Sequence, residues 1–255
     1  MGKLVTNHAE APLLDHLEDL RKRLIIAVLF WLAGTSFAWF YRTELLEWLK
    51  RPLTFSELYN AGKLQLVSQQ LTDQLIMSFL IAMWGGLALT LPFILHQVWL
   101  FVAPGLYAHE RRWAAPFVLG AGFSFIIGAA FCYFVILPQM VPFLVDFLGG
   151  AVNGVYPIAT YISQVVTFLV AFGIIFELPI LSFVLTKIGI VNAGMMGRVR
   201  RPAGIVILIV AAVITPTTDP INLMLVAVPI YVLYELGIIV SRLAAPRGRA
   251  ALAQE

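Results

Sequence analysis

Hydrophobic residues fall in six segments separated by shorter polar stretches. The segments lie at about 24–41, 74–101, 114–138, 161–188, 202–214 and 221–240. A helix needs roughly 17–25 mostly apolar residues to cross the hydrocarbon core of a bilayer. The pattern therefore predicts an all-α polytopic membrane protein with six transmembrane helices, of which the last two are short.

Prolines and segment lengths predict where these helices bend or end. The second and fourth segments are longer than the hydrocarbon core requires, and they contain Pro92 and Pro179. Proline removes a backbone donor, so we expect kinks at both sites. The fifth segment, 202–214, reaches only about 20 Å. Two prolines within 215–220 then turn the chain into the last segment.

The segments outside these spans predict the remaining organisation. Residues 1–23 are expected to form a cytoplasmic amphipathic helix, because Leu13, Leu17, Leu20 and Leu24 recur at helical spacing. No cleavable signal peptide is expected. We take 24–240 as the six-helix transmembrane domain and 241–255 as a cytoplasmic tail.

The first outer loop, 42–73, is the largest connection between spans. Within it, Leu45, Leu46, Trp48 and Leu49 are spaced to place a short amphipathic helix on the membrane surface.

The distribution of basic residues predicts the orientation, since cytoplasmic loops carry an excess of Lys and Arg. With the N-terminus inside, the outer side holds only Arg42, Lys50, Arg51 and Lys63 of the 17 basic residues. The other 13 (17 − 4) lie in cytoplasmic segments. Both termini are therefore expected to be cytoplasmic.

Composition limits the class of protein. Of the 255 residues, 60% are hydrophobic and 12% are charged, whereas a soluble domain is about one quarter charged. The net charge of +3 is small and its basic residues are scattered, so nucleic-acid binding is not expected.

Motifs for catalysis and metal binding are missing from the sequence. The four histidines show no metal-ligand spacing, and Cys132 is the single cysteine. No protease or hydrolase motif is present. We expect no enzymatic activity, no metal and no cofactor.

Glu177 is a carboxylate inside the fourth apolar segment. Such a group costs about 2.5–3.5 kcal/mol on insertion scales, and it indicates a functional site by default. Pro179 frees a backbone acceptor beside it, and Gly173 leaves room for a partner on the same face. The structural alternative is a hydrogen bond to a neighbouring helix, such as the region of Gln97.

Glu235, in the last segment, is a secondary candidate. We expect it to lie nearer the cytoplasmic interface, where a structural role is the simpler explanation.

The loop after the second segment combines aromatic residues with Glu110, Arg111 and Arg112. The two arginines can be explained as anchors for the third span. Glu110 has no role in topology, and with Glu18 and Asp19 it would form an anionic patch on the cytoplasmic side. Carboxylates accept guanidinium groups in bidentate geometry, so this patch is a candidate receptor for arginines on a ligand.

The chain resembles the TatC family, the multispanning receptor subunit of the twin-arginine protein translocase. The resemblance covers nearly the whole length and rests on residues 16–24, 97–112, 172–179 and 227–237. It implies six spans with cytoplasmic termini in the inner membrane of a prokaryote.

The resemblance also implies a function. Proteins of this family recognise paired arginines in signal peptides on folded cargo, and they assemble with single-span TatA and TatB-type subunits as oligomers within a larger complex. Export is driven by the proton-motive force. The signal-peptide site would comprise Glu18, Asp19, Arg21, Phe101, Pro104, Glu110, Arg111 and Arg112. Glu177, with Pro179 and Gln97, would form an intramembrane polar site for a partner.

The sequence departs from the family pattern at two positions, and one alternative function remains open from the sequence. The family commonly has glutamate at the position of Asp19, so either Glu18 or Asp19 would contact the signal. The family also often has an aspartate near the position of Pro157, so the role of that loop is undetermined. The alternative function is a proton-coupled small-solute transporter that uses Glu177, although the chain lacks the internal repeats of such proteins.

Overall fold

The computed structural model describes residues 10–102, 114–147, 154–187, 189–215 and 219–244. The first half contains α1 (Glu10–Phe40), α2 (Arg42–Lys50), the 3₁₀ helix η1 (Arg51–Phe55), α3 (Glu57–Asn60), β1 (Leu64–Val67) and α4 (Asp73–Val102). The second half contains α5 (Ala114–Phe131), the π-helical turn η4 (Cys132–Ile136), α6 (Leu137–Val145), β2 (Gly154–Pro157), α7 (Ile158–Ile175), α8 (Leu178–Lys187), α9 (Ala193–Arg198), α10 (Arg200–Ile214) and α11 (Pro220–Ala244).

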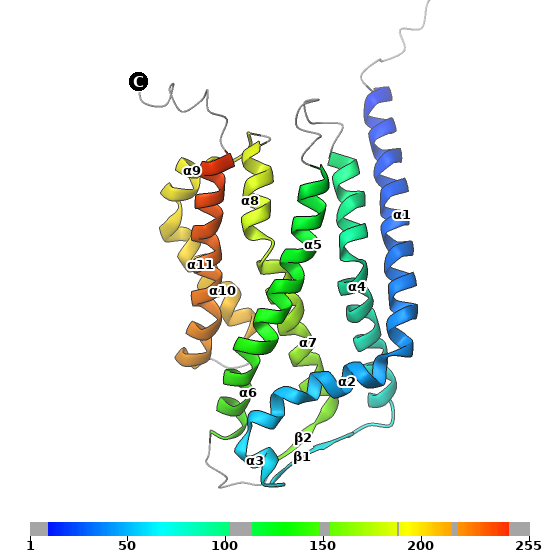
Figure 1. Cartoon of the computed structure of the whole chain (residues 1–255), viewed down its shortest axis with the longest axis vertical. Coiled ribbons are helices and arrows are strands. Elements are labelled where there is room, and N and C mark those ends of the chain that lie inside the picture. The colour runs from blue at the N-terminus through cyan, green and yellow to red at the C-terminus, as the bar shows by residue number, and fades with distance from the viewer. Residues whose placement is uncertain (1–9, 103–113, 148–153, 188, 216–218, 245–255) are drawn as a thin grey trace, which may run out of the picture.

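The long helices stand side by side, and the small elements cover one end of them (Figure 1). The start of α1 and the end of α11 lie at the same end of the molecule, together with α9. The opposite end carries α2, α3, β1 and β2, and we call it the outer cap. This arrangement agrees with the prediction that both termini lie on one side.

Five helical stretches are long and apolar enough to cross a membrane: 17–40, 73–101, 120–145, 158–187 and 220–244. They correspond to five of the six predicted spans. The sixth, α10, has 15 residues. Its shortness was predicted, whereas α11 has 25 residues and is longer than expected. The end of α10 and the start of α11 still lie well short of the outer cap (Figure 1).

The predicted N-terminal helix and the first span form one continuous helix of 31 residues, so the expected boundary at residue 23 falls inside α1. This helix packs mainly on α4. The two backbones approach closely at Gly34 and Gly86, where a Cβ on Gly86 would lie 2.3 Å from the Thr35 nitrogen. Small residues of this kind allow membrane helices to meet without a large hydrophobic driving force.

The third span runs further than predicted. The sequence suggested an end at residue 138, where Pro138 follows the apolar run, but α6 continues to Val145. The extra residue of the π-helical turn at Cys132–Ile136 and the position of Pro138 in the first turn of α6 explain the difference. Proline is tolerated in a first helical turn because its missing N–H has no intrahelical partner there.

Two tyrosine hydroxyls attach α2 to the outer ends of the spans. Tyr133, within the π-helical turn, donates to the Trp48 carbonyl at 2.8 Å, and Tyr161 of α7 donates to the Leu49 carbonyl at 3.0 Å. Both carbonyls lie in the last turn of α2, where the Trp48 carbonyl also accepts from the Arg51 N–H. The structure therefore confirms a helix at this position and fixes it across the bundle, while its place on the membrane surface stays a prediction.

The outer cap also contains a two-stranded parallel sheet that was not predicted, with Leu64 opposite Gly154 and Val67 opposite Pro157. Each strand has four residues, which is too short for a recognisable alternating pattern. Asp146 ties the end of α6 to the start of α3. Its carboxylate accepts from the Ser56 hydroxyl at 2.7 Å and from the Glu57 N–H at 3.1 Å.

Candidate functional site

Glu18 and Asp19 lie in the N-terminal part of α1 and differ in orientation. Glu18 pairs with Lys22 at 2.9 Å, and its side chain is 63% exposed. Asp19 pairs with Arg23 at 3.2 Å, and its side chain is 32% exposed. Arg21 is also exposed. Ion pairs of this partly solvated kind are weak, about 0.3–0.5 kcal/mol, so both carboxylates are available to a better partner.

Asp19 belongs to the stripe of α1 that faces α4, and Glu18 does not. Half-buried residues recur every four positions along this side of α1, beside the buried Gly34 and Ala38, whereas residues 18, 22 and 25 are exposed; the half-buried residues are Trp39, Thr35, Trp31, Ala27, Arg23 and Asp19. This stripe is the one that packs on α4.

The packing of α1 on α4 also fixes the height of Asp19. The two helices are antiparallel, with the Phe30 ring stacked on Phe93 at 5.2 Å and Gly34 against Thr90. Eleven residues back from Phe30 is Asp19, and eleven residues forward from Phe93 is residue 104, two past the end of α4 at Val102. Asp19 therefore lies at the height where α4 ends, about one helical turn beyond Phe101.

Four predicted members of this site, Pro104, Glu110, Arg111 and Arg112, lie outside the described residues. They belong to the segment 103–113 that follows α4 directly in the chain.

Glu177 lies in a break between two helices of the fourth span. α7 ends at Ile175 and α8 begins at Leu178, so Phe176 and Glu177 form the joint. The break confirms the bend predicted from Pro179. The Phe176 carbonyl at this joint accepts a hydrogen bond from the Ser124 hydroxyl of α5 at 2.6 Å. Ten residues of α8 separate Glu177 from the end of the span, a depth of about 15 Å.

Two buried oxygens near this region have no hydrogen-bond partner among the described residues, Oε1 of Glu177 and Oε1 of Gln97. A buried polar atom without a partner costs about 1–3 kcal/mol. Gln97 and Glu177 do not satisfy each other. Pro92 of α4 faces Gly122 of α5, so Gln97 lies farther from the outer cap than Glu177 by about 10 Å along the helices.

Gly173 does not provide the open space that was expected from the sequence. A Cβ at this position would lie 2.4 Å from the Phe125 ring of α5. A second close approach follows at Gly128, where a Cβ would lie 2.5 Å from the Phe172 carbonyl oxygen. Both glycines are used for packing of α5 on α7, so any partner of Glu177 must approach from another side.

Glu235 is held in an ion pair. Arg200 of α10 donates to its two carboxylate oxygens at 2.7 and 2.8 Å. The bidentate geometry links the start of α10 to α11, which supports the structural role that was the simpler explanation.

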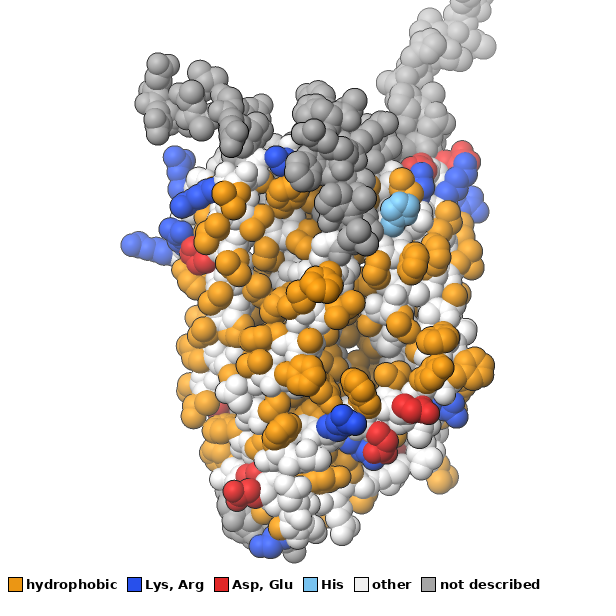
Figure 2. Space-filling view, viewed as in Figure 1, with side chains coloured by type: hydrophobic (Ala, Val, Ile, Leu, Met, Phe, Trp, Pro, Cys, Tyr) orange, Lys and Arg blue, Asp and Glu red, His pale blue; other side chains and the backbone are white. Residues whose placement is uncertain are grey.

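A concave face opens beside the bundle, above α2 in the view of Figure 2. A cavity of about 620 Å³ lies there between the ends of α1 and α2 and the middle of α4 and α5. A second cavity of about 210 Å³ shares Leu45, Trp48, Gly85 and Ala88 with it. Glu177 lines neither of them.

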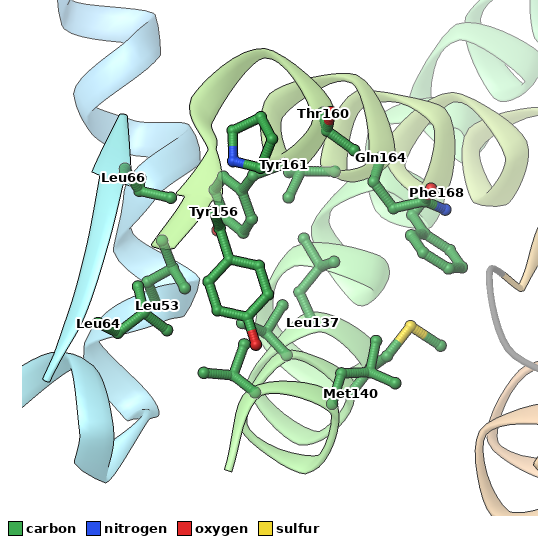
Figure 3. Close-up of a pocket in the computed structure, with 15 residues that line it drawn as sticks. Leu53, Leu64, Leu66, Leu137, Met140, Tyr156, Thr160, Tyr161, Gln164 and Phe168 are labelled. Atoms are coloured by element: carbon green, nitrogen blue, oxygen red, sulfur yellow. The ribbon is translucent and has the colours of Figure 1, made fainter. Parts of the chain in front are cut away.

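The loop that contains Pro157 lines a third cavity, of about 340 Å³, in the outer cap (Figure 3). Its walls come from η1, the two strands, α6 and α7, and its labelled side chains are mostly apolar. Gln164, at its edge, donates to the Ile214 carbonyl at 3.4 Å and so connects α7 to the end of α10.

Sequence analysis missed two polar side chains that fix these elements, Ser124 at the break beside Glu177 and Asp146 in the outer cap. Each was visible as a polar residue within an apolar stretch, but its acceptor or donor is distant in the sequence. Among the described residues, no cluster of three or more His, Cys, Asp or Glu could hold a metal ion.

Comparison with known proteins gives one consistent result. The family model for the Sec-independent protein translocase protein (TatC) matches residues 15–229. The TatC protein of Deinococcus radiodurans is 57% identical over 234 residues, which cover 92% of this chain and 87% of that protein. The TatC protein of Aquifex aeolicus is 34% identical over 235 residues, which cover 91% and 95%.

Solved structures agree with the sequence matches. A crystal structure of the twin arginine translocase receptor TatC superposes with a TM-score of 0.77 at 32% identity, and it covers 90% of this chain and 99% of that chain. A second crystal structure of that receptor, in the detergent DDM, gives a TM-score of 0.78 at 33% identity, with coverage of 89% and 99%.

Proposed function

Because the chain belongs to the TatC family of protein translocase subunits, we propose that it is the receptor of a twin-arginine translocase. It is a multi-pass membrane protein that takes part in Sec-independent protein translocation. In the proposed role it binds the paired arginines of signal peptides on folded cargo. The alternative of a proton-coupled small-solute transporter has no support from the comparisons.

The observation that carries the proposal is the position of Asp19. Asp19 lies on the α4-facing stripe of α1, at the height where α4 ends and the chain continues into the segment that contains Glu110. We propose that Asp19, rather than the more exposed Glu18, joins Glu110 in the site. Two carboxylates would receive two guanidinium groups, each with bidentate hydrogen bonds.

The other predicted members would shape this site. Phe101 and Pro104 would form its apolar wall, and Arg111 and Arg112 would hold Glu110 at the membrane interface. Arg21 would keep the end of α1 in position. The apolar part of a signal peptide would then continue along the membrane-facing surface, as its hydrophobic character requires.

Single-span partners of the TatA and TatB type would complete the translocase. Oε1 of Glu177 has no hydrogen-bond partner among the described residues, which supports a partner site at this depth. A polar group on a partner helix would stabilise the complex most where it supplies a hydrogen bond that is otherwise missing. The proton-motive force would drive export, and neither a cofactor nor catalytic chemistry belongs to this proposal.

Peptide titration tests the proposed function directly. The purified full chain in detergent should bind a signal peptide with two arginines at least about tenfold more tightly than the same peptide with two lysines, because lysine cannot make the bidentate contact. Equal affinity for the two peptides would contradict the proposal that paired guanidinium groups are recognised.

The orientation proposed is that of an inner-membrane protein with cytoplasmic termini. Basic residues at the end formed by α1, α9 and α11 outnumber those at the outer cap, as the positive-inside rule requires. A cysteine-labelling experiment on intact cells should modify a cysteine introduced at residue 60 and leave one at residue 195 unmodified. The reverse pattern would overturn the proposed orientation.

A further inference from the structure

Basic side chains gather where α9, the start of α10 and the end of α11 meet. Arg198, Arg200, Arg201 and Arg242 are all exposed there. Figure 2 shows basic side chains over this corner of the molecule, with an acidic side chain just below them. The proposed recognition of signal peptides does not use this cluster, which lies at the far side of the bundle from α1 (Figure 1).

Most of this positive charge is not neutralised within the protein. Glu235 is half-buried beside the cluster, and both of its oxygens are engaged by Arg200. None of the four ion pairs found among the described residues includes Arg198, Arg201 or Arg242. Arg242 interacts with Glu235 only at longer range, so all three guanidinium groups can bind an external anion.

Arg201 lies at the N-terminal end of an exposed apolar stripe on α10. Residues four apart lie on one face of a helix, and Ile205, Ile209 and Val213 follow Arg201 at this spacing, with exposures of 61%, 58% and 81%. A ligand that covers this face must be charged at one end and apolar along the rest. An anionic phospholipid has that form.

The shortness of α10 gives a physical reason for such a ligand. Its 15 residues reach only about 22 Å, which is less than the hydrocarbon thickness of about 30 Å. The bilayer must therefore thin or deform around α10. A lipid whose phosphate is bound at the end of α10 would lie at the depth that this short helix sets.

We propose that Arg201, with Arg198 and Arg242, binds the phosphate of an anionic phospholipid, whose acyl chains lie along Ile205, Ile209 and Val213. Each arginine near a membrane surface contributes about fivefold to the affinity for anionic lipid. The site would stay occupied in a membrane rich in such lipids, and it does not depend on signal recognition at Asp19.

Native mass spectrometry of the purified full chain tests this inference. The protein is titrated with phosphatidylglycerol or with phosphatidylcholine of the same acyl chains, and bound lipids are counted. We expect tighter binding of phosphatidylglycerol, and we expect Arg201→Gln with Arg242→Gln to weaken it about tenfold or more. The matched control, Arg51→Gln with Lys63→Gln, removes two basic residues from the outer cap and should leave the tightest binding step unchanged.

Four results would overturn the proposal. One is equal affinity for the two lipids, and another is an unchanged preference in the Arg201→Gln, Arg242→Gln variant. The third is efficient competition by glycerol phosphate, which would show a site for a free anion and no use of the apolar stripe. If the variant instead loses an acidic protein partner while lipid binding persists, the cluster is a protein contact and the lipid proposal fails. All substituted arginines are exposed, so a thermal unfolding curve like that of the unsubstituted chain is expected.

Discussion

Replacing Asp19 by asparagine is expected to weaken the binding of a twin-arginine signal peptide about tenfold or more. A charge-assisted hydrogen bond is worth about 1.5–3 kcal/mol, and every 1.4 kcal/mol is a factor of about ten in affinity. Asparagine keeps the size of the side chain but removes the charge and one acceptor. Glu110→Gln is expected to have a comparable effect, since both carboxylates belong to the proposed site.

Glu18→Gln is the matched control for Asp19→Asn. The two positions are adjacent on α1, and each carboxylate has one cation four residues further on, so their contributions to helix stability are similar. A much smaller loss for Glu18→Gln would support the orientation argued from the α1 stripe. A large loss for Glu18→Gln with unchanged binding for Asp19→Asn would refute it. The losses should shrink at high salt, because screening weakens exposed charge pairs.

The choice between Glu18 and Asp19 could have been narrowed from the sequence. Gly34 and Ala38 are small residues of the first span, and small residues mark the face that meets a neighbouring helix. At about 100° per residue around a helix, Asp19 lies about 60° from Gly34, whereas Glu18 lies about 160° from it. What the sequence lacked was the identity of the neighbour, because the contact between α1 and α4 joins residues about 60 positions apart, as at Phe30 and Phe93.

The missing identity of the neighbouring helix also explains why the role of Gly173 in packing was not predicted. A glycine beside a polar residue in an apolar span reads equally well as an opening or as a close contact. Only the arrangement of α5 against α7 decides between them, and it fills the space with the Phe125 ring. The break at Phe176 and Glu177 was predictable because its cause, Pro179, is local.

The ends of the helices, too, could be predicted only where their cause is local in the sequence. The π-helical turn at Cys132–Ile136 has no local sequence signature, so the third span was predicted too short. Tyr133 lies in that turn and reaches the end of α2. The turn is therefore connected to the outer cap, and we attribute it to this tertiary contact.

Glu177→Ala is expected to abolish most contact with a partner helix at this depth, while signal binding at Asp19 persists. An interhelical hydrogen bond in a membrane is worth about 1–2 kcal/mol in model peptides, so crosslinking to a partner should fall about fivefold or more. Glu177→Gln keeps the shape and an acceptor oxygen, and it should retain much of the crosslinking and of the export of folded cargo.

Ser124→Ala separates this role from a structural one. It removes the donor to the Phe176 carbonyl at the same helix break, which should cost about 1–3 kcal/mol of stability without changing Glu177. The measurements are crosslinking from a photoreactive residue next to Glu177, cargo export, and thermal unfolding in detergent. If both variants lose export, each in proportion to its loss of stability, the role of Glu177 is only to stabilise the helix break. If Glu177→Ala exports cargo normally, Glu177 has neither role. Loss of crosslinking in Glu177→Ala at unchanged stability is the result expected of a partner site, because an unsatisfied carboxylate oxygen in the membrane is stabilised only when another chain brings a donor to it.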